Sequence, residues 1–489
     1  MSRRSTEVAI VGAGVCGLLV AKVLAEAGRE VTLVERGALR SHHDQFATGR
    51  HVSSIPSAAP NHDSDPRARD YPWEYCYGVG GSTLAWAGVA PRFEPSDFEM
   101  RTRFGVGRDW PFGYDELEPY YVRAEALLAV AGPDGAQPPH PFAPVDELIG
   151  PYLQPYRPLP QSRPTLPVNG RPACSAVARC DMCPVDARYS GLHTFEDSGM
   201  AEAANVTLLD QTIVGRLRTQ GRRVQSLECI RADGERFELT AGTTVMAAAG
   251  LENPGLLLRS GLEGPDVGRW LSDHEHKVIE LSLDVPSRHG YGATPATGIS
   301  HLYADDAHRA ERGAVLVFPV NPGTQATVEL LDGLLDGRSG VALRDSLRER
   351  FTRTLVLDTV GEDLPRSDRF VELSPVKDRY GLPLNRIHFP GDTEYLTSAY
   401  RFLEADLETR LAPLGARFER TIPRAGGAHL LGTCYAGEAE GVVDPNLRHH
   451  DIENLYVAGG SSFPTYSAAH PTLTIAALAL RLGDHLASR

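Results

Sequence analysis

The feature that most constrains the fold is a glycine-rich turn near the N-terminus. Residues 8–11 are apolar, and Gly12, Gly14 and Gly17 follow them with Gly-x-Gly-x-x-Gly spacing. Glycine at these positions allows a tight turn, close approach of the backbone to a pyrophosphate, and close packing of the next helix on the strand. The phosphates of a dinucleotide would then lie at the positive N-terminus of that helix. The pattern predicts a strand–turn–helix unit that binds a dinucleotide.

A helix and a second strand are predicted directly after the turn. Apolar residues recur at helical spacing as far as Leu24, and an apolar run at residues 31–34 ends at Glu35. Glu35 lies about 20 residues beyond the turn, where an acidic side chain can accept hydrogen bonds from a ribose. The glycine spacing alone is weak evidence. Together with the strand, the helix and the acid, it favours a dinucleotide site over a plain βαβ unit.

Length and charge restrict the remaining possibilities. A chain of 489 residues is expected to form two or three domains. The 63 acidic and 49 basic residues give a formal charge of -14, which argues against a nucleic acid as partner. The charge is compatible with a neutral or cationic small-molecule substrate, and a contribution to solubility alone is the alternative.

The sequence predicts a cytoplasmic protein without a membrane span. No apolar run approaches the roughly 18 residues that a spanning helix needs. The seven cysteines are an odd number in a long chain, which is not typical of a disulfide framework.

The predicted fold class is an α/β, Rossmann-like, dinucleotide-binding domain joined to a second, α+β domain on an antiparallel sheet. Residues 244–250 predict a buried strand beside the first one, and residues 454–457 and 472–486 predict a further strand and a helix of the same domain. Short alternating strands and one longer helix in between predict the second domain. The predicted division is 1–276 for the dinucleotide-binding domain, 277–424 for the second domain, and 425–489 for the return to the dinucleotide-binding domain.

Two irregular segments are predicted within the first domain. Residues 36–72 are polar and without period, which predicts a surface or lid segment. Prolines are dense between residues 138 and 172, which predicts a linker or wrapping loop.

Short motifs distributed over nearly the whole chain occur in a characteristic order. After the N-terminal turn come Val79-Gly80-Gly81-Ser82-Thr83, Ala249-Gly250 with Pro254, Val267-Gly268-Arg269 with Asp273-His274, His429 with Gly432-Thr433, Asn454-Leu455-Tyr456-Val457, Phe463-Pro464-Thr465 and His470-Pro471-Thr472. This set resembles the glucose–methanol–choline (GMC) family of FAD-dependent alcohol oxidoreductases. Trp86 with Pro91-Arg92-Phe93 is most similar to its pyranose oxidase and sugar dehydrogenase branch.

The resemblance implies a catalytic pair at the flavin, which maps onto His429 and His470. An imidazole that titrates near neutral pH is a suitable base for an alcohol proton, and a second one can hold the alkoxide oxygen. In the family the position of His429 is the usual proton acceptor, and that of His470 is histidine or asparagine. A satisfied structural histidine is the ordinary alternative for any one of the 17 histidines.

The resemblance also implies that residues 1–276 and 425–489 form an FAD-binding domain and residues 277–424 a substrate-binding domain. It implies the residues that hold FAD as well. They are Gly12, Gly14, Gly17, Glu35, Gly80, Gly81, Ser82, Ala249, Gly250, Gly459, Gly460, Pro471 and Thr472. Pyranose oxidases link FAD covalently through a histidine just before the tryptophan, and Ala85 stands at that place here. Alanine offers no nucleophile, so non-covalent FAD is predicted. Pro471 and Thr472 would face the pyrimidine edge of the flavin, where negative charge develops on reduction.

Three cysteines form a second candidate site. Cys174, Cys180 and Cys183 lie within ten residues, and Pro184 follows them. The segment resembles the one that carries a three-iron cluster in some FAD sugar dehydrogenases of the family, with the last spacing one residue shorter. The resemblance identifies these cysteines as candidate ligands of a [3Fe-4S] cluster, and a zinc site or three ordinary thiols are the alternatives.

The sequence as a whole predicts an enzyme that oxidises a hydroxyl of a sugar, glycoside or aminocyclitol with FAD. Oxygen and a redox protein are the alternative electron acceptors. A choline-like or sterol alcohol oxidase is one alternative function, and it would need an aromatic cage for a cation or a largely apolar cavity. A non-catalytic flavin-binding redox partner is the other, and the presence of both His429 and His470 argues against it.

Overall fold

The computed structural model describes most of the chain. The described residues are 2–42, 62–64, 73, 75–176, 180, 183–290, 293–305, 307–321, 325–423 and 427–489. Most of the segment predicted as a lid, residues 36–72, lies outside the described residues.

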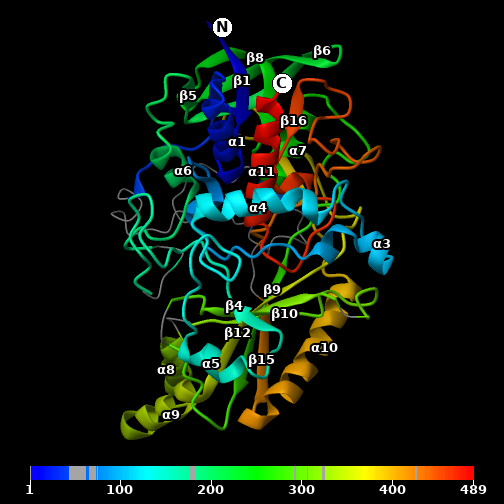
Figure 1. The fold of residues 1–489 in the computed structure, drawn as a ribbon. Coiled ribbons are helices and arrows are strands. Elements are labelled where there is room, and N and C mark those ends of the chain that lie inside the picture. The colour runs from blue at the N-terminus through cyan, green and yellow to red at the C-terminus, as the bar shows by residue number, and fades with distance from the viewer. Residues whose placement is uncertain are drawn as a thin grey trace.

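The upper part of the molecule in Figure 1 contains a seven-stranded sheet. The order along it is β5 (Val206–Leu209), β2 (Val31–Val34), β1 (Ser2–Val11), β8 (Arg236–Met246), β7 (Arg223–Arg231) and β6 (Thr212–Gln220), and β16 (Leu455–Val457) pairs with β8. Strands β5, β2, β1, β8 and β16 pair in parallel with one another, whereas β7 pairs antiparallel with β8 and β6 pairs antiparallel with β7. Parallel strands with helical crossovers are typical of dinucleotide-binding folds.

The two ends of the chain meet in this domain. Helix α1 (Val15–Glu26) lies beside α11 (Thr472–Ala487), and a Cβ on Gly483 would stand 2.8 Å from Cβ of Val23. Helix α4 (Tyr114–Leu128) crosses α11, where the Tyr121 hydroxyl lies 2.7 Å from Oγ1 of Thr474. The predicted fold class, with a Rossmann-like domain assembled from both ends, is confirmed.

The lower part of Figure 1 contains a six-stranded antiparallel sheet. Its order is β15 (Arg417–Pro423), β9 (Glu275–Ser282), β12 (Thr354–Gly361), β11 (Val315–Pro319), β10 (Gly298–Leu302) and β4 (Tyr156–Pro158). Helix α10 (Glu394–Leu411) covers one face, where its Leu403 and Leu407 join a core with Ile279, Leu281 and Leu355. Because side chains alternate along a strand, His276 and Asp358 belong to the opposite face.

One segment of this domain differs from its prediction. Residues 144–149 and 156–158, within the expected wrapping loop, form helix α5 (Pro144–Ile149) and the edge strand β4. The many prolines in this segment weakened the sequence signals of both elements. Pro144 occupies the first turn of the helix, where no N–H is needed, and Pro158 lies in an edge strand, where proline is tolerated.

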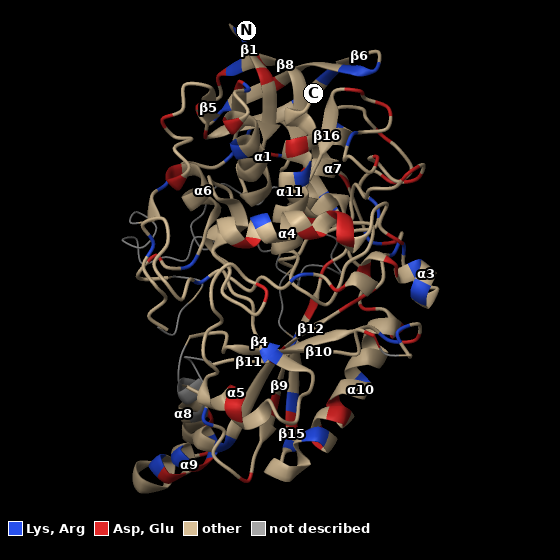
Figure 2. Ribbon diagram, viewed as in Figure 1, with Lys and Arg blue, Asp and Glu red and all other residues tan. Residues whose placement is uncertain are grey.

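A smaller sheet and several short elements accompany the two larger sheets. Strands β13 (Phe370–Lys377), β14 (Pro383–His388) and β3 (His62–Ser64) form a three-stranded sheet against α7 (Ala249–Arg259). The others are α3 (Met100–Phe104), α6 (Gly191–Asp197), α8 (Gln325–Leu335), α9 (Gly340–Arg353), and the 3-10 helices η3 (Gly81–Leu84), η4 (Pro95–Phe98), η5 (Ala412–Leu414) and η6 (Gly460–Ser462). Charges of both signs occur on the upper and lower parts, for example side by side on α9 and α10 (Figure 2). Among the helices described, none has the length and apolar character to cross a bilayer.

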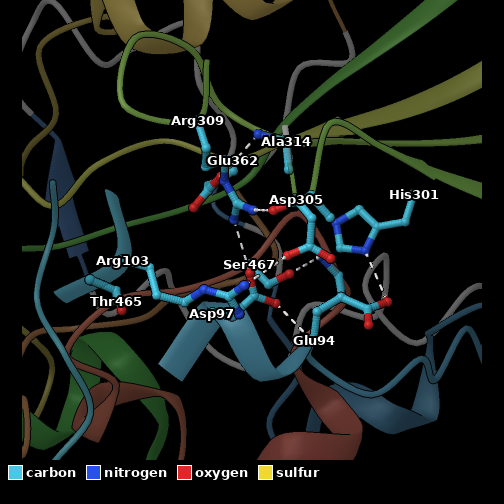
Figure 3. Close-up of polar contacts among 12 residues, drawn as sticks. Glu94, Asp97, Arg103, His301, Asp305, Arg309, Ala314, Glu362, Thr465 and Ser467 are labelled. Carbon is cyan, nitrogen blue, oxygen red and sulfur yellow. Dashed lines mark hydrogen bonds and ion pairs between the residues drawn. The ribbon is translucent and has the colours of Figure 1, made fainter. Parts of the chain in front are cut away.

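A buried ion cluster joins the upper and lower parts, as Figure 3 shows. The guanidinium of Arg309 lies 2.9 Å from Oδ1 of Asp97 in η4 and 2.7 Å from Oε2 of Glu362, next to the end of β12. All three side chains are at most 1% exposed. The same Glu362 oxygen accepts a hydrogen bond of 2.9 Å from the backbone N–H of Ala314. The cluster therefore fixes η4 of the upper part against the six-stranded sheet.

Candidate active site

A cavity of about 570 Å³ lies between the seven-stranded sheet and the six-stranded sheet. Its walls come from the N-terminal turn, from η3, from the N-terminus of α7, from the even-numbered face of β9 and β12, and from the start of α11. Its volume is within the range of small-molecule and cofactor sites.

The glycine turn forms one end of the cavity. Gly12 has a φ of 101°, and a Cβ there would stand 2.6 Å from the carbonyl oxygen of Ala247, so only glycine fits. A Cβ on Gly17 would lie 2.0 Å from the carbonyl oxygen of Gly12, so this glycine allows α1 to pack on β1. Gly12 and Gly14 also line the cavity without a side chain, so a ligand in it can approach the backbone of the turn.

Glu35 stabilises this turn from the end of β2. Its Oε2 accepts a hydrogen bond of 2.9 Å from the N–H of Ala13, and its Oε1 accepts bonds of 2.8 and 3.0 Å from Gly37 and Gly78. Burial raises the pKa of Glu35 above its usual value, against the lowering effect of these backbone donors. The side chain lines the cavity. Glu35 therefore holds the turn from a position on the cavity wall.

The predicted FAD-binding residues converge on the cavity with two exceptions. Those that line it are Gly12, Gly14, Glu35, Gly81, Ser82, Ala249, Gly250, Gly459, Gly460, Pro471 and Thr472. Gly17 and Gly80 lie beneath it, and the N–H of Gly80 donates to the carbonyl of Ala13 at 2.8 Å. Ala85 also lines the cavity. The backbone cradle at Gly12 and the size of the cavity fit FAD.

Three histidines gather on the opposite wall. The ring centroids of His429 and His470 are 5.1 Å apart, and His276 lies 5.3 Å from His429 and 5.8 Å from His470. One ring nitrogen from each forms a group within 4.8 Å of one another. Residues 429 and 470, distant from the N-terminal turn in sequence, are thus brought to the same cavity.

Hydrogen bonds around His274 assign the tautomer of His429. Burial lowers the pKa of His274 to about 3, so its ring is neutral and carries a single N–H. Its Nε2 faces the carbonyl oxygen of Ser467, which only accepts, so the proton is on Nε2. Nδ1 of His274 therefore accepts, and Nδ1 of His429, 2.8 Å away, donates. His429 is left with Nε2 as the nitrogen that accepts a proton.

A further contact fixes the backbone of His429. Its N–H donates a hydrogen bond of 2.8 Å to Oδ1 of Asp273. Asp273 and His274 both precede β9, so one short segment orients both the main chain and the ring of His429.

Sequence reasoning missed two residues of this wall, His276 and Asp358. Both line the cavity, and Nδ1 of His276 lies 3.7 Å from Oδ1 of Asp358. The sequence did offer a signal for His276, which lies two residues after His274. Alternate residues of a strand share one face, so both side chains are expected on the same side. No motif contains Asp358, which reaches the site only through the pairing of β12 with β9.

Cys174, Cys180 and Cys183 are not among the residues that line the cavity. Cys180 and Cys183 are buried, and Cys174 is half-buried. Nη1 of Arg163 lies 3.4 Å from Sγ of Cys180 and 3.9 Å from Sγ of Cys174. Among the described residues, Nε and Nη2 of this buried guanidinium have no hydrogen-bond partner. Within the same residues, the three sulfurs do not form a group within 4.8 Å, unlike the histidines.

Comparisons with known proteins agree with this architecture. Family models described as GMC oxidoreductase match residues 160–276 and 365–479, and one described as FAD dependent oxidoreductase matches residues 7–107. The 6'''-hydroxyparomomycin C oxidase of Streptomyces lividus is 30% identical over 99% of this chain and 92% of its own. The fructose dehydrogenase large subunit of Gluconobacter japonicus is 28% identical over 98% of this chain and 97% of its own.

The fold is also found among solved structures. The crystal structure of pyridoxine 4-oxidase from Mesorbium loti has a TM-score of 0.66 at 20% identity and covers 99% of both chains. The resemblance stated from the sequence motifs is therefore confirmed. This protein belongs to the GMC oxidoreductase family of FAD-dependent enzymes.

Proposed function

We propose that this protein oxidises a hydroxyl of a sugar, glycoside or aminocyclitol to the carbonyl. The observation that carries the proposal is the pair His429 and His470, 5.1 Å apart on the wall of a cavity whose other end is the dinucleotide turn. Relatives named fructose dehydrogenase large subunit, paromamine 6'-oxidase and C-glycoside 3-oxidase, at 24–28% identity, support a polyhydroxylated substrate.

The chemistry is divided between the two histidines and the cofactor. FAD, when bound, supplies the acceptor of the hydride that leaves the alcohol carbon. We assign Nε2 of His429 as the base that takes the hydroxyl proton, because its tautomer leaves that nitrogen unprotonated. We assign His470 to the oxygen that becomes the carbonyl. Residues 1–276 and 425–489 would hold FAD, and residues 277–424 would contribute the substrate wall.

The N-terminus of α11 would contribute electrostatically to the reaction. Pro471 and Thr472 begin that helix and line the cavity. The positive end of the helix would stabilise negative charge on the pyrimidine edge of the reduced flavin.

Anaerobic bleaching of the flavin tests the proposal. Sugars, glycosides and aminocyclitols are added in turn to oxygen-free holoenzyme, and loss of the oxidised flavin absorbance is followed. We expect at least one of them to bleach the flavin and to yield a carbonyl product. If choline or a sterol bleaches the flavin and no polyol does, the proposed substrate class is wrong. Oxygen consumption against dye reduction then separates an oxidase from a dehydrogenase.

Replacing His274 tests the positioning of His429. His274→Phe removes the acceptor for Nδ1 of His429 and is expected to slow anaerobic flavin reduction roughly 100-fold, as a misplaced group can. His274→Gln keeps an acceptor oxygen and is expected to recover much of the rate. FAD content is the control, and the pH profile of flavin reduction should change in His274→Phe alone. Two variants with the wild-type rate would show that His274 has no positioning role.

Ala85 predicts the mode of FAD attachment. We infer that FAD is held without a covalent bond, because no nucleophilic side chain stands at residue 85. Acid precipitation of the holoenzyme should leave free FAD in the supernatant. Yellow colour that stays with the precipitated protein would contradict this inference.

We infer that Cys174, Cys180 and Cys183 hold an iron–sulfur cluster, which supplies one-electron transfer. Support comes from the cysteine spacing and from the buried guanidinium of Arg163, whose positive charge suits an anionic cluster. Their sulfurs are too widely spread for a single metal ion as they stand, which argues against the zinc alternative.

Iron and sulfide analysis of anaerobically purified protein tests the cluster. We expect both elements in the wild type and in Cys229→Ser, a control at a buried cysteine of β7, and their loss in Cys180→Ser. A wild-type protein that contains neither element has no cluster.

A further inference from the structure

His276, His429 and His470 have the spacing of a three-histidine metal site. One ring nitrogen from each lies within 4.8 Å of the others, and among the residues that the structure describes no other group of three histidine, cysteine or carboxylate donors meets this limit. The ring centroids are 5.1, 5.3 and 5.8 Å apart. Three imidazoles around a tetrahedral zinc ion, with Zn–N distances of about 2.0–2.1 Å, have centroids roughly 5 Å apart. The rings therefore need only a small movement to share one ion.

The three rings are carried by segments that the fold holds in place. His276 lies in β9, between β12 and β15 in the six-stranded sheet. The N–H of His429 donates a hydrogen bond of 2.8 Å to Oδ1 of Asp273. His470 lies two residues before the start of α11 at Thr472. Because these segments are already positioned, binding of an ion costs little ordering of the chain.

Two of the rings also have the kind of neighbour that metal-binding histidines have. Nδ1 of His429 lies 2.8 Å from Nδ1 of His274, and Nδ1 of His276 lies 3.7 Å from Oδ1 of Asp358. A histidine that binds a metal uses one ring nitrogen for the ion and directs the other to such a partner, often a carboxylate. The contacts therefore assign Nε2 as the coordinating nitrogen of both His276 and His429.

The donor atoms and their surroundings define the kind of ion. Imidazole nitrogens suit Zn²⁺, Ni²⁺ and Cu²⁺, whereas Mg²⁺ and Ca²⁺ prefer oxygen ligands. All three histidines line the cavity and are partly exposed, so an ion can reach them. With three protein ligands, a tetrahedral ion keeps a fourth position for water or another small ligand.

We propose that His276, His429 and His470 bind Zn²⁺ reversibly, and that the bound ion inhibits the enzyme in competition with its substrate. The ion occupies Nε2 of His429, the nitrogen assigned as the base, and it takes the place beside His470 where the substrate hydroxyl would bind. Zinc binding is independent of the proposed oxidation, whereas the inhibition rests on it. His276, which no motif contains, is the residue that completes the site.

Titration of the holoenzyme with zinc chloride, after dialysis against EDTA and then against buffer, tests the binding. Calorimetry is expected to show one equivalent of Zn²⁺ bound to the wild type, and magnesium chloride at the same concentration should not bind there. His276→Gln removes one imidazole and keeps a polar side chain. It is expected to weaken Zn²⁺ binding about 100-fold, because loss of an outer partner alone costs about 10- to 100-fold.

Two control variants locate the ion. His450→Gln changes a histidine that does not line the cavity, and Cys180→Ser removes a cysteine of the second candidate site. Both are expected to bind Zn²⁺ as the wild type does. X-ray absorption at the zinc edge locates the ion without any variant, so it decides the question even where His276→Gln does not fold. Three imidazole nitrogens and no sulfur are the expected ligands.

Anaerobic flavin reduction measures the inhibition. With a substrate that bleaches the flavin, Zn²⁺ is expected to raise the substrate concentration that gives the half-maximal rate and to leave the rate at saturation unchanged. Addition of EDTA should restore the original rate, because the ion is bound reversibly.

The outcomes separate this inference from the proposed function. The metal site is overturned if the wild type binds no Zn²⁺, if His276→Gln binds it equally well, or if sulfur ligands are found. Bleaching by a polyol would then leave the proposed function intact. Zn²⁺ that binds through three nitrogens without slowing flavin reduction overturns the inhibition. If Zn²⁺ binds as expected and no polyol bleaches the flavin, the metal site stands and the proposed oxidation fails.

Discussion

His429→Ala is expected to lower the rate of flavin reduction by substrate by about 10²- to 10⁴-fold, with FAD still bound. The residue has no part in the glycine turn or in the hydrogen bonds of Glu35, so the dinucleotide end of the cavity stays intact. What is lost is the imidazole whose Nδ1 is hydrogen-bonded to His274 at 2.8 Å and whose Nε2 is left to accept a proton. Stopped-flow absorbance of the anaerobic enzyme measures the rate.

A second histidine serves as the control for this variant. His450 lies a few residues before β16. Its Nε2 is 3.4 Å from the carbonyl oxygen of Glu440, and the residue does not line the cavity. His450→Ala should reduce its flavin at the wild-type rate. A wild-type rate in His429→Ala itself would exclude His429 as the base.

Arg309→Met is expected to lower the free energy of unfolding by about 3–5 kcal/mol, because it leaves two buried carboxylates without their partner. The guanidinium contacts Asp97 at 2.9 Å and Glu362 at 2.7 Å, and these side chains are at most 1% exposed. Urea unfolding of the holoenzyme, followed by circular dichroism and by flavin fluorescence, measures the loss.

Arg103→Met is the matched control in the same region. Arg103 pairs with Asp305 at 3.8 Å, and the two side chains are 44% and 70% exposed. An exposed pair of this kind contributes roughly 0–1 kcal/mol. If both variants unfold at the same urea concentration, the buried cluster does not stabilise the junction of the two parts.

The parts of the fold that the sequence predicted are those with a local signature. The spacing of Gly12, Gly14 and Gly17 predicts the turn because the pattern lies within one strand–turn–helix unit. The close approach of Gly17 to Gly12 is local in the same way, whereas that of Gly12 to Ala247 involves a distant segment. The helical period of α11 likewise predicted a buried helix at the C-terminus. The histidines were identified through motifs, and the structure then placed their rings 5.1 Å apart.

The parts that the sequence did not predict depend on pairings between distant segments. Asp97 and Arg309 are 212 residues apart, and nothing near either residue indicates the other. Asp358 enters the cavity because β12 pairs with β9 in a register that places it opposite Val278. Strand β4 was missed for a different reason. Proline weakens the sequence signal of a strand, although an edge strand tolerates proline.

The most direct test of the central claim is a deuterium isotope effect on anaerobic flavin bleaching. A substrate identified in the screen is labelled at the carbon that becomes the carbonyl, and its bleaching rate is compared with that of the unlabelled compound. If the chain removes the hydroxyl proton through His429 while hydride passes to FAD, the labelled compound will bleach the flavin several-fold more slowly. Two results would contradict the account. One is that the labelled and unlabelled compounds, both saturating, reduce the flavin at equal rates. The other is that no alcohol bleaches the flavin.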